Sequence, residues 1–199
     1  VTATAWGLTG TVGGFFGFGG TPVLETAEVY SWETGLGVCN QSEGSIAAGS
    51  CSTSSSWFSS DEHQLDNSGD NDFILFVFNQ EVIFNSITVD PFNNQDTDAS
   101  FAVATISGAV DLTDTEQFSG VFSNEQIKSG PYTTFPQSIG LDGWTGNALL
   151  FSASSVSSDD AFKIASIDVT ATAVIPVPAS AWLFASGVAA LVVRKRSAK

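Results

Sequence analysis

One run of the chain constrains its fold more than any other: residues 73–78 read Phe-Ile-Leu-Phe-Val-Phe without a polar residue. A continuous apolar run of this length, rich in aromatic and β-branched side chains, has the dimensions of a β-strand. Residues 82–89 form a second apolar segment after the polar residues 79–81. This interruption indicates a hairpin between two strands.

Further segments rich in Val, Ile, Phe and Thr recur along the chain, and none has a sustained helical periodicity. They are residues 26–32, 100–106, 120–122, 148–153 and 162–173. Clusters of Gly, Ser, Asn and Asp separate them, as turns require. The last segment alternates apolar with polar or small residues, which is typical of a half-buried strand. We therefore expect residues 1–173 to form one all-β domain, a β-sandwich of jelly-roll type.

The residues after this domain have a different character. Pro176 and Pro178 lack backbone donors and keep the preceding residues extended, so a helix begins only at about Ala179. Residues 179–193 carry no charge, and 15 helical residues span roughly 22 Å, which is short of the ~30 Å hydrocarbon layer. A buried C-terminal helix is the alternative, but such a helix would not end in three adjacent cations.

This tail resembles the PEP-CTERM sorting signal of exported bacterial proteins. The resemblance is carried by Val174, Pro176-Val177-Pro178, Ala179, Trp182, the apolar run and Arg194-Lys195-Arg196. The tripeptide is usually Pro-Glu-Pro, and Pro-Val-Pro also occurs in signals of this type. The resemblance implies transient insertion into the inner membrane, cleavage near the prolines by an exosortase, and a final location on the surface or in the extracellular matrix of a Gram-negative bacterium. We accordingly expect Val1 to lie close to the mature start, after removal of a signal peptide.

The distribution of charge agrees with an exported protein. Four of the six basic residues lie in the tail, so residues 1–193 contain 21 acidic residues and only two basic ones, Lys128 and Lys163. Binding to nucleic acid or to anionic lipid requires clustered Lys and Arg, and this balance excludes both. It favours solubility, divalent cations and cationic partners.

Two cysteines, Cys39 and Cys51, stand without a neighbouring His or a third Cys to complete a metal site. In an oxidising compartment a disulfide between them would close a loop of about 12 residues and contribute about 2 to 3 kcal/mol. Two unpaired thiols are the alternative that spacing alone leaves open.

The densest polar segment, residues 60–72, precedes the strongest strand. It resembles a motif of exosortase-dependent surface proteins, in which Leu-Gly-Val is followed by His-x-x-Asp-Asn-x-Gly-x-x-Asp and an apolar strand. The matching residues are Leu36, Gly37, Val38, His63, Asp66, Asn67, Gly69 and Asp72. The resemblance implies no established activity.

Carboxylate and amide oxygens in a turn suit Ca²⁺, which takes six to eight oxygen ligands. The candidate ligands are Asp66, Asn67, Asp70, Asp72, Asp96 and Asp98. The spacing does not match an EF-hand. In the alternative interpretation Asp66 and Asn67 cap backbone donors in a tight turn, and His63 holds the loop by hydrogen bonding.

Two functions of different classes remain. The first is a structural surface or matrix protein associated with exopolysaccharide, which assembles through sheet edges or through the Gly- and Phe-rich residues 10–20. The second is a carbohydrate-binding module in which exposed Trp6, Trp32, Trp57 or Trp144 stacks on sugar rings, with or without Ca²⁺. We expect no enzyme, because His63 is the only histidine and no Gly-x-Ser-x-Gly motif is present.

Overall fold

The computed structural model describes residues 1–8, 24–40, 64–67, 71–91, 94–113, 120–154 and 159–172. These residues form nine strands: β1 Thr2–Leu8, β2 Leu24–Trp32, β3 Gly35–Cys39, β4 Leu65–Asp66, β5 Asp72–Pro91, β6 Ala99–Ala104, β7 Gln126–Lys128, β8 Gln137–Ala153 and β9 Ala161–Ala171. The prediction of an all-β domain is confirmed. Residues 10–20 and the tail from residue 173 onward lie outside the described residues.

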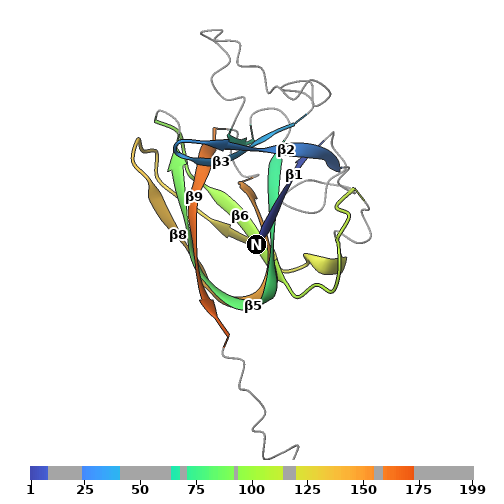
Figure 1. Cartoon of the computed structure of the whole chain (residues 1–199). Helices are drawn as coiled ribbons and strands as arrows, with labels where there is room; N and C mark the ends of the chain where they lie inside the picture. The colour runs from blue at the N-terminus through green and yellow to red at the C-terminus, as the bar shows by residue number, and fades with distance from the viewer. Residues whose placement is uncertain are drawn as a thin grey trace, which may run out of the picture.

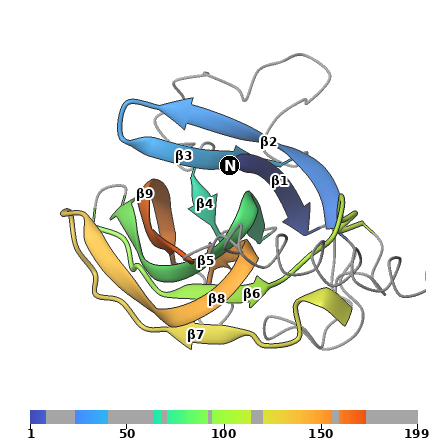
Figure 2. The same ribbon diagram turned by 60° about the horizontal axis from the view of Figure 1, so that its bottom comes forward.

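All nine strands belong to a single sheet in the order β4-β9-β3-β2-β1-β5-β8-β6-β7. A further pairing of β9 with β5 closes β1, β2, β3, β9 and β5 into a five-stranded barrel, and the pairings between strands are antiparallel. Strands β8, β6 and β7 extend the sheet outward from β5 (Figure 1). The predicted two-sheet sandwich is therefore replaced by one sheet that closes on itself, although β1–β3 still face β5, β8 and β6 across the core (Figure 2).

The closure depends on the length of β5. Its residues 72–77 pair with β1 and its residues 82–91 pair with β9, while β8 accompanies the other edge along both halves. The predicted hairpin at residues 79–81 is wrong, because these exposed polar residues mark a bend within one continuous strand. Register shifts against β8 at this bend and beside Asn85 let both strands turn together, as Figure 1 shows at the bottom of the view.

The apolar run at residues 73–78 is explained by two cores, one on each face of β5. Ile74 and Phe76 belong to the barrel core, which we define as the apolar cluster on the inner face of the sheet and which also contains Phe84. Phe73 and Leu75 belong to a second cluster on the opposite face of β5, β6 and β8. Because successive side chains of a strand point to opposite faces, a strand with two buried faces reads as a continuous apolar run.

The second cluster also accounts for two differences from the sequence predictions. Residues 120–122, for which a strand is predicted, contain a helical turn at Gly120 and Val121 that places Phe122, fully buried, against this face. Trp6 packs into the same cluster and is only 8% exposed. Trp6 is therefore a core residue and not a platform for sugar rings.

Candidate functional site

Three carboxylates meet where β9 begins. One oxygen from each of Asp96, Asp159 and Asp160 lies within 4.8 Å of the other two; we call these residues the acidic cluster. Asp96 forms an isolated parallel bridge with Asp160, and its backbone N–H donates to the carbonyl of Asp159 over 3.2 Å. The backbone itself therefore brings together two acidic segments that are more than 60 residues apart in the sequence.

Asn67 forms hydrogen bonds with Asp160, the buried residue of the acidic cluster. Asp160 is 1% exposed, and its Oδ2 accepts a hydrogen bond of 2.7 Å from Asn67 Nδ2. The backbone N–H of Asp160 donates to Asn67 Oδ1 over 3.1 Å, and Asn67 Nδ2 also donates to the carbonyl of Ser154. Asn67 thus joins three segments across the fold, in contrast to the predicted capping of a local turn.

Asp98 connects this network to the loop between β7 and β8. Its backbone N–H donates to Asp160 Oδ1 over 3.0 Å, and its carbonyl accepts from the N–H of Ser154 over 3.0 Å. Its own Oδ1 accepts a hydrogen bond of 2.6 Å from the N–H of Gly130. Position 130 requires glycine, because a Cβ there would lie 2.6 Å from the carbonyl oxygen of Thr97.

Crowding of carboxylates affects the electrostatics of the acidic cluster. The pKa of Asp96 is raised above its ordinary value, mainly by burial and further by the charges of Asp98 and Asp159, although a hydrogen bond from the Thr97 N–H opposes the shift. Ionisation of the Asp96 carboxyl is therefore less favourable in the folded protein than in water. A divalent cation would relieve this repulsion, and three convergent carboxylate oxygens are ligands of the kind that Ca²⁺ prefers.

The structure divides the predicted calcium ligands into two groups. Asn67, Asp96 and Asp98 come together at the start of β9. Asp66 and Asp72 are fully buried, and Asp72 Oδ1 accepts a hydrogen bond of 3.1 Å from Asn40 Nδ2. These two aspartates are not among the carboxylates that converge.

Other candidate residues lie outside the described residues, namely Asp70, His63 and Gly69. Asp159 and Asp160 were not predicted, and the available signal was their position directly before the last strand. The two halves of the surface-protein motif do meet, because the N–H of Val38 donates to the carbonyl of Gln64 over 3.0 Å.

Cys39 ends β3 in the interior, where it is 1% exposed, and it is disulfide-bonded. Cys51, the only other cysteine of the sequence, lies outside the described residues. A disulfide at this position would tie β3 to the long segment that follows it.

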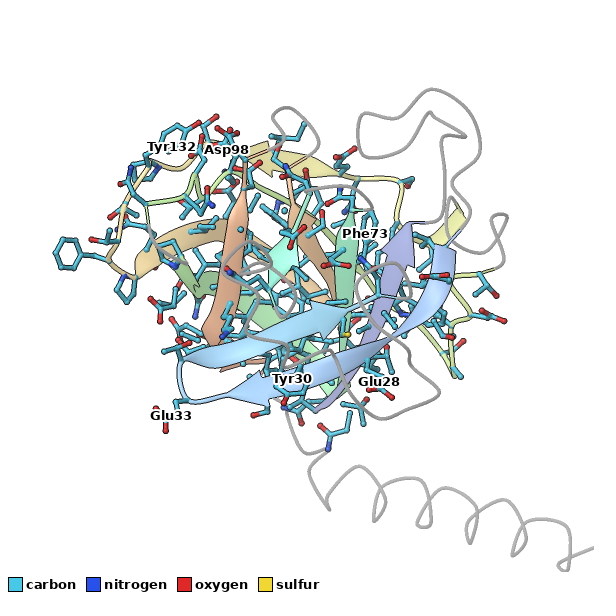
Figure 3. The ribbon with its side chains drawn as sticks, turned by 90° about the horizontal axis from the view of Figure 1, so that it is seen from above. Glu28, Tyr30, Glu33, Phe73, Asp98 and Tyr132 are labelled. Atoms are coloured by element: carbon cyan, nitrogen blue, oxygen red, sulfur yellow. The ribbon has the colours of Figure 1, made fainter. Side chains whose placement is uncertain are left out.

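The aromatic side chains are distributed differently from the expectation of exposed tryptophans. Trp144 is half-buried and packs against the barrel core, whereas Trp57 and the side chain of Trp32 lie outside the described residues. Among the described residues the large aromatic side chains exposed to solvent are Tyr132 at 55% and Phe135 at 72%. Both belong to the loop that Asp98 fastens, and Figure 3 labels Tyr132 beside Asp98.

Comparisons with known proteins identify no relative. No protein-family model matches the chain, and neither a curated protein nor a solved structure is significantly similar to it. Within the described residues there is no helix with both the length and the apolar character needed to cross a bilayer.

Proposed function

We propose that the protein is an exported bacterial surface or extracellular-matrix protein, sorted by its C-terminal tail and retained among exopolysaccharide. The observation that carries this proposal is the order of features in residues 174–199: the Pro176-Val177-Pro178 motif, an uncharged apolar run and Arg194-Lys195-Arg196. The tail enters the inner membrane transiently, and an exosortase cleaves it near the prolines. The cationic end remains on the cytoplasmic side, in agreement with the positive-inside rule.

The direction of β9 supports a defined orientation of the domain. β9 begins beside the acidic cluster and ends at Ala171, close to the start of the tail (Figure 1). Eleven residues of strand, at about 3.3 Å each, separate the two ends by roughly 30 Å. A domain that is held through its C-terminal end would therefore present the acidic cluster on the side away from the attachment point.

Two further observations support a location outside the cytoplasm. Cys39 is disulfide-bonded, and structural disulfides persist mainly in oxidising compartments. The scarcity of basic residues before the tail is compatible with a soluble surface domain that binds neither nucleic acid nor anionic lipid. The proposal assigns no catalytic role to the chain.

We propose that Ca²⁺ binds at the acidic cluster and has a structural role. Asp96, Asp159 and Asp160 supply three carboxylate oxygens, and Ca²⁺ accepts six to eight oxygen ligands from side chains, carbonyls and water. The ion would join the segment before β6 to the start of β9. It would reinforce contacts that Asn67 and Asp98 already make by hydrogen bonding.

The described strands give less support to assembly through sheet edges. The outermost strands, β4 and β7, contain only two and three residues. Beyond β7, Asn124 Nδ2 donates to the carbonyl of Val103 on β6 over 3.0 Å and so covers part of that edge. Short and covered edges disfavour strand addition by a second chain. Homo-oligomers or polymers of the protein would therefore need another contact surface.

Intact-mass analysis of the protein recovered from the surface of the source bacterium tests the sorting proposal. We expect a chain that ends near Pro178 and is found in the surface or matrix fraction. A matched strain in which Pro176 and Pro178 are both replaced by Ala should accumulate the uncut chain in the inner membrane. Recovery of the full-length wild-type chain from the cytosol would overturn the proposal.

A further inference from the structure

The loop between β7 and β8 has features of a ligand-binding surface. We define the aromatic loop as residues 129–136, which carry exposed Tyr132 and Phe135. Exposed aromatic rings on a soluble domain cost solubility, and two of them on one short loop suggest contact with a partner. The partner must match both the rings and the polar groups around them.

Hydrogen bonds join residues 130–133 of the aromatic loop to the segment before β6. Besides the bond from Gly130 to Asp98, Thr97 Oγ1 donates to the carbonyl of Pro131 over 3.1 Å, and the N–H of Thr133 donates to the carbonyl of Gln95 over 3.1 Å. At the other end Gln137 Nε2 donates to the carbonyls of Phe135 and Pro136. Because residues 130–133 are anchored to another segment, the backbone around Tyr132 loses little conformational entropy when a ligand binds to its ring.

A pocket of about 200 Å³, with both polar and apolar lining residues, opens between residues 129–131 of the aromatic loop and the first part of β8. Its lining residues include Lys128, Ser138 and Asp142, and also Gln137, whose Nε2 is already bonded to two carbonyls of the loop. Lys128 is already paired with Asp142 over 2.5 Å, so the pocket supplies donors and an acceptor without an excess positive charge. Its volume is below the roughly 300 to 1,000 Å³ of pockets for drug-sized ligands, which suits a single ring-sized unit.

We propose that the aromatic loop and this pocket bind a neutral polysaccharide, with one sugar ring in the pocket and the neighbouring rings against Tyr132 and Phe135. Sugars combine hydroxyl groups, which need both donors and acceptors, with apolar ring faces that pack on aromatic side chains. The strongly acidic domain repels polyanions, so the polymer is neutral. This binding would retain the proposed surface protein in its matrix. It rests on the proposed function in one respect, because an exported location is what brings the domain into contact with polysaccharide.

The position of the surface agrees with this role. The loop is fastened to Asp98 beside the acidic cluster, at the end of β9 opposite to the tail. A protein held through its C-terminal end would therefore direct Tyr132 outward, toward the matrix.

Affinity electrophoresis of the purified full chain, in native gels containing dextran, galactomannan or mixed-linkage β-glucan, tests the proposal. We expect at least one of these neutral polymers to retard the chain and alginate, a polyanion, to leave its mobility unchanged. Tyr132→Ala and Phe135→Ala should each weaken retardation about five- to tenfold. Lys128→Ala, which removes a donor from the pocket wall, should also weaken it.

Ile127→Ala is the matched control, because Ile127 is an exposed apolar residue of β7 outside the loop. It should change retardation less than about twofold. The proposal is overturned if no neutral polymer retards the wild type, or if the loop variants bind as the wild type does. A change from dimer to monomer in these variants, with retardation unaltered, would instead make the rings a contact between two copies. Because binding is measured on purified protein, its failure leaves the sorting proposal intact.

Discussion

The barrel core and the acidic end of the molecule are stabilised in different ways. The barrel core consists of apolar side chains that alternate along paired strands, and its packing follows directly from strand register. The acidic end depends on a few polar contacts between residues 32 to 93 positions apart, among them Asn67 with Asp160 and Gly130 with Asp98. Loss of one apolar residue leaves a cavity, whereas loss of one polar group leaves its partner without a hydrogen bond. The two regions should therefore respond to different substitutions.

The largest effect is expected in the barrel core. Phe84 is fully buried and packs edge-on against Phe78 with ring centroids 5.4 Å apart. Phe84→Ala should lower the free energy of unfolding by about 3 to 5 kcal/mol, through lost burial and the cavity left behind. Denaturant titration of the full chain measures this. Phe135→Ala makes the same chemical change at an exposed position and should stay within about 0.5 kcal/mol of wild type. Equal losses would mean that Phe84 is not part of a packed core.

A smaller loss is expected at the acidic end. Both oxygens of Asp160 accept hydrogen bonds, from Asn67 Nδ2 and from the Asp98 N–H. Asp160→Asn offers only one acceptor, so a buried donor is left unsatisfied at a cost of about 1 to 3 kcal/mol. Asp168→Asn, at an exposed position of the same strand, should be close to neutral. A neutral Asp160→Asn would show that this network contributes little to stability.

A substitution at Gly130 tests the contribution of the aromatic loop to stability without changing any charge in the acidic cluster. In Gly130→Ala the added Cβ would press against the backbone of Thr97, and relief of that contact displaces the aromatic loop at a cost of about 1 to 2 kcal/mol. Gly140 has no atom within 4 Å of an added Cβ, so Gly140→Ala is the matched control. Equal melting temperatures for the two variants would contradict the close approach at position 130.

The smallest effect concerns pH and calcium. Because the folded-state pKa of Asp96 is raised, its ionisation destabilises the fold, and this cost grows as pH rises through the folded pKa and vanishes below the unfolded pKa. Asp96→Asn should therefore be more stable than wild type at pH 7, by less than about 1 kcal/mol, and equally stable at low pH.

In the presence of Ca²⁺ the wild type should instead be more stable than Asp96→Asn. Millimolar CaCl₂ should raise the melting temperature of the wild type, EDTA should reverse the rise, and Asp96→Asn should respond less. A wild-type melting temperature that is indifferent to both additions would remove the calcium proposal.

The sequence predicts the strands better than their connections. The alternation and apolar runs place β2, β6 and β9 close to their observed bounds, because burial of strand faces is a local property of the sequence. The bend at residues 79–81 could not be distinguished from a hairpin, since both require exposed polar residues. Closure of the barrel depends on which edge of β5 receives β9, and no local pattern encodes that choice.

The candidate site was predictable only in part for the same reason. Asn67, Asp96 and Asp98 were chosen by residue type, but their partners Asp159 and Asp160 lie directly before β9, more than 60 residues later in the chain. Asp66 and Asp72 are of the same chemical type and close to Asn67 in the chain, and Asp66 even pairs with Ala161 at the start of β9, yet both are fully buried and neither is among the carboxylates that converge. Proximity in sequence was therefore a poor guide to convergence in space.

The antiparallel pairing of β9 with β5 has a mechanical consequence. Tension that enters through the C-terminus reaches Ala171 first, and Ala171 is paired with Val82 at the end of the ladder. Because the acidic cluster lies at the other end of β9, tension between that end and the tail runs along the strand and loads its hydrogen bonds to β5 together, in shear. The ladder to β5 therefore resists extension as a whole, and Asn67 and Asp98 hold the start of the strand through Asp160, so a load on the tail is carried through β9 across the domain.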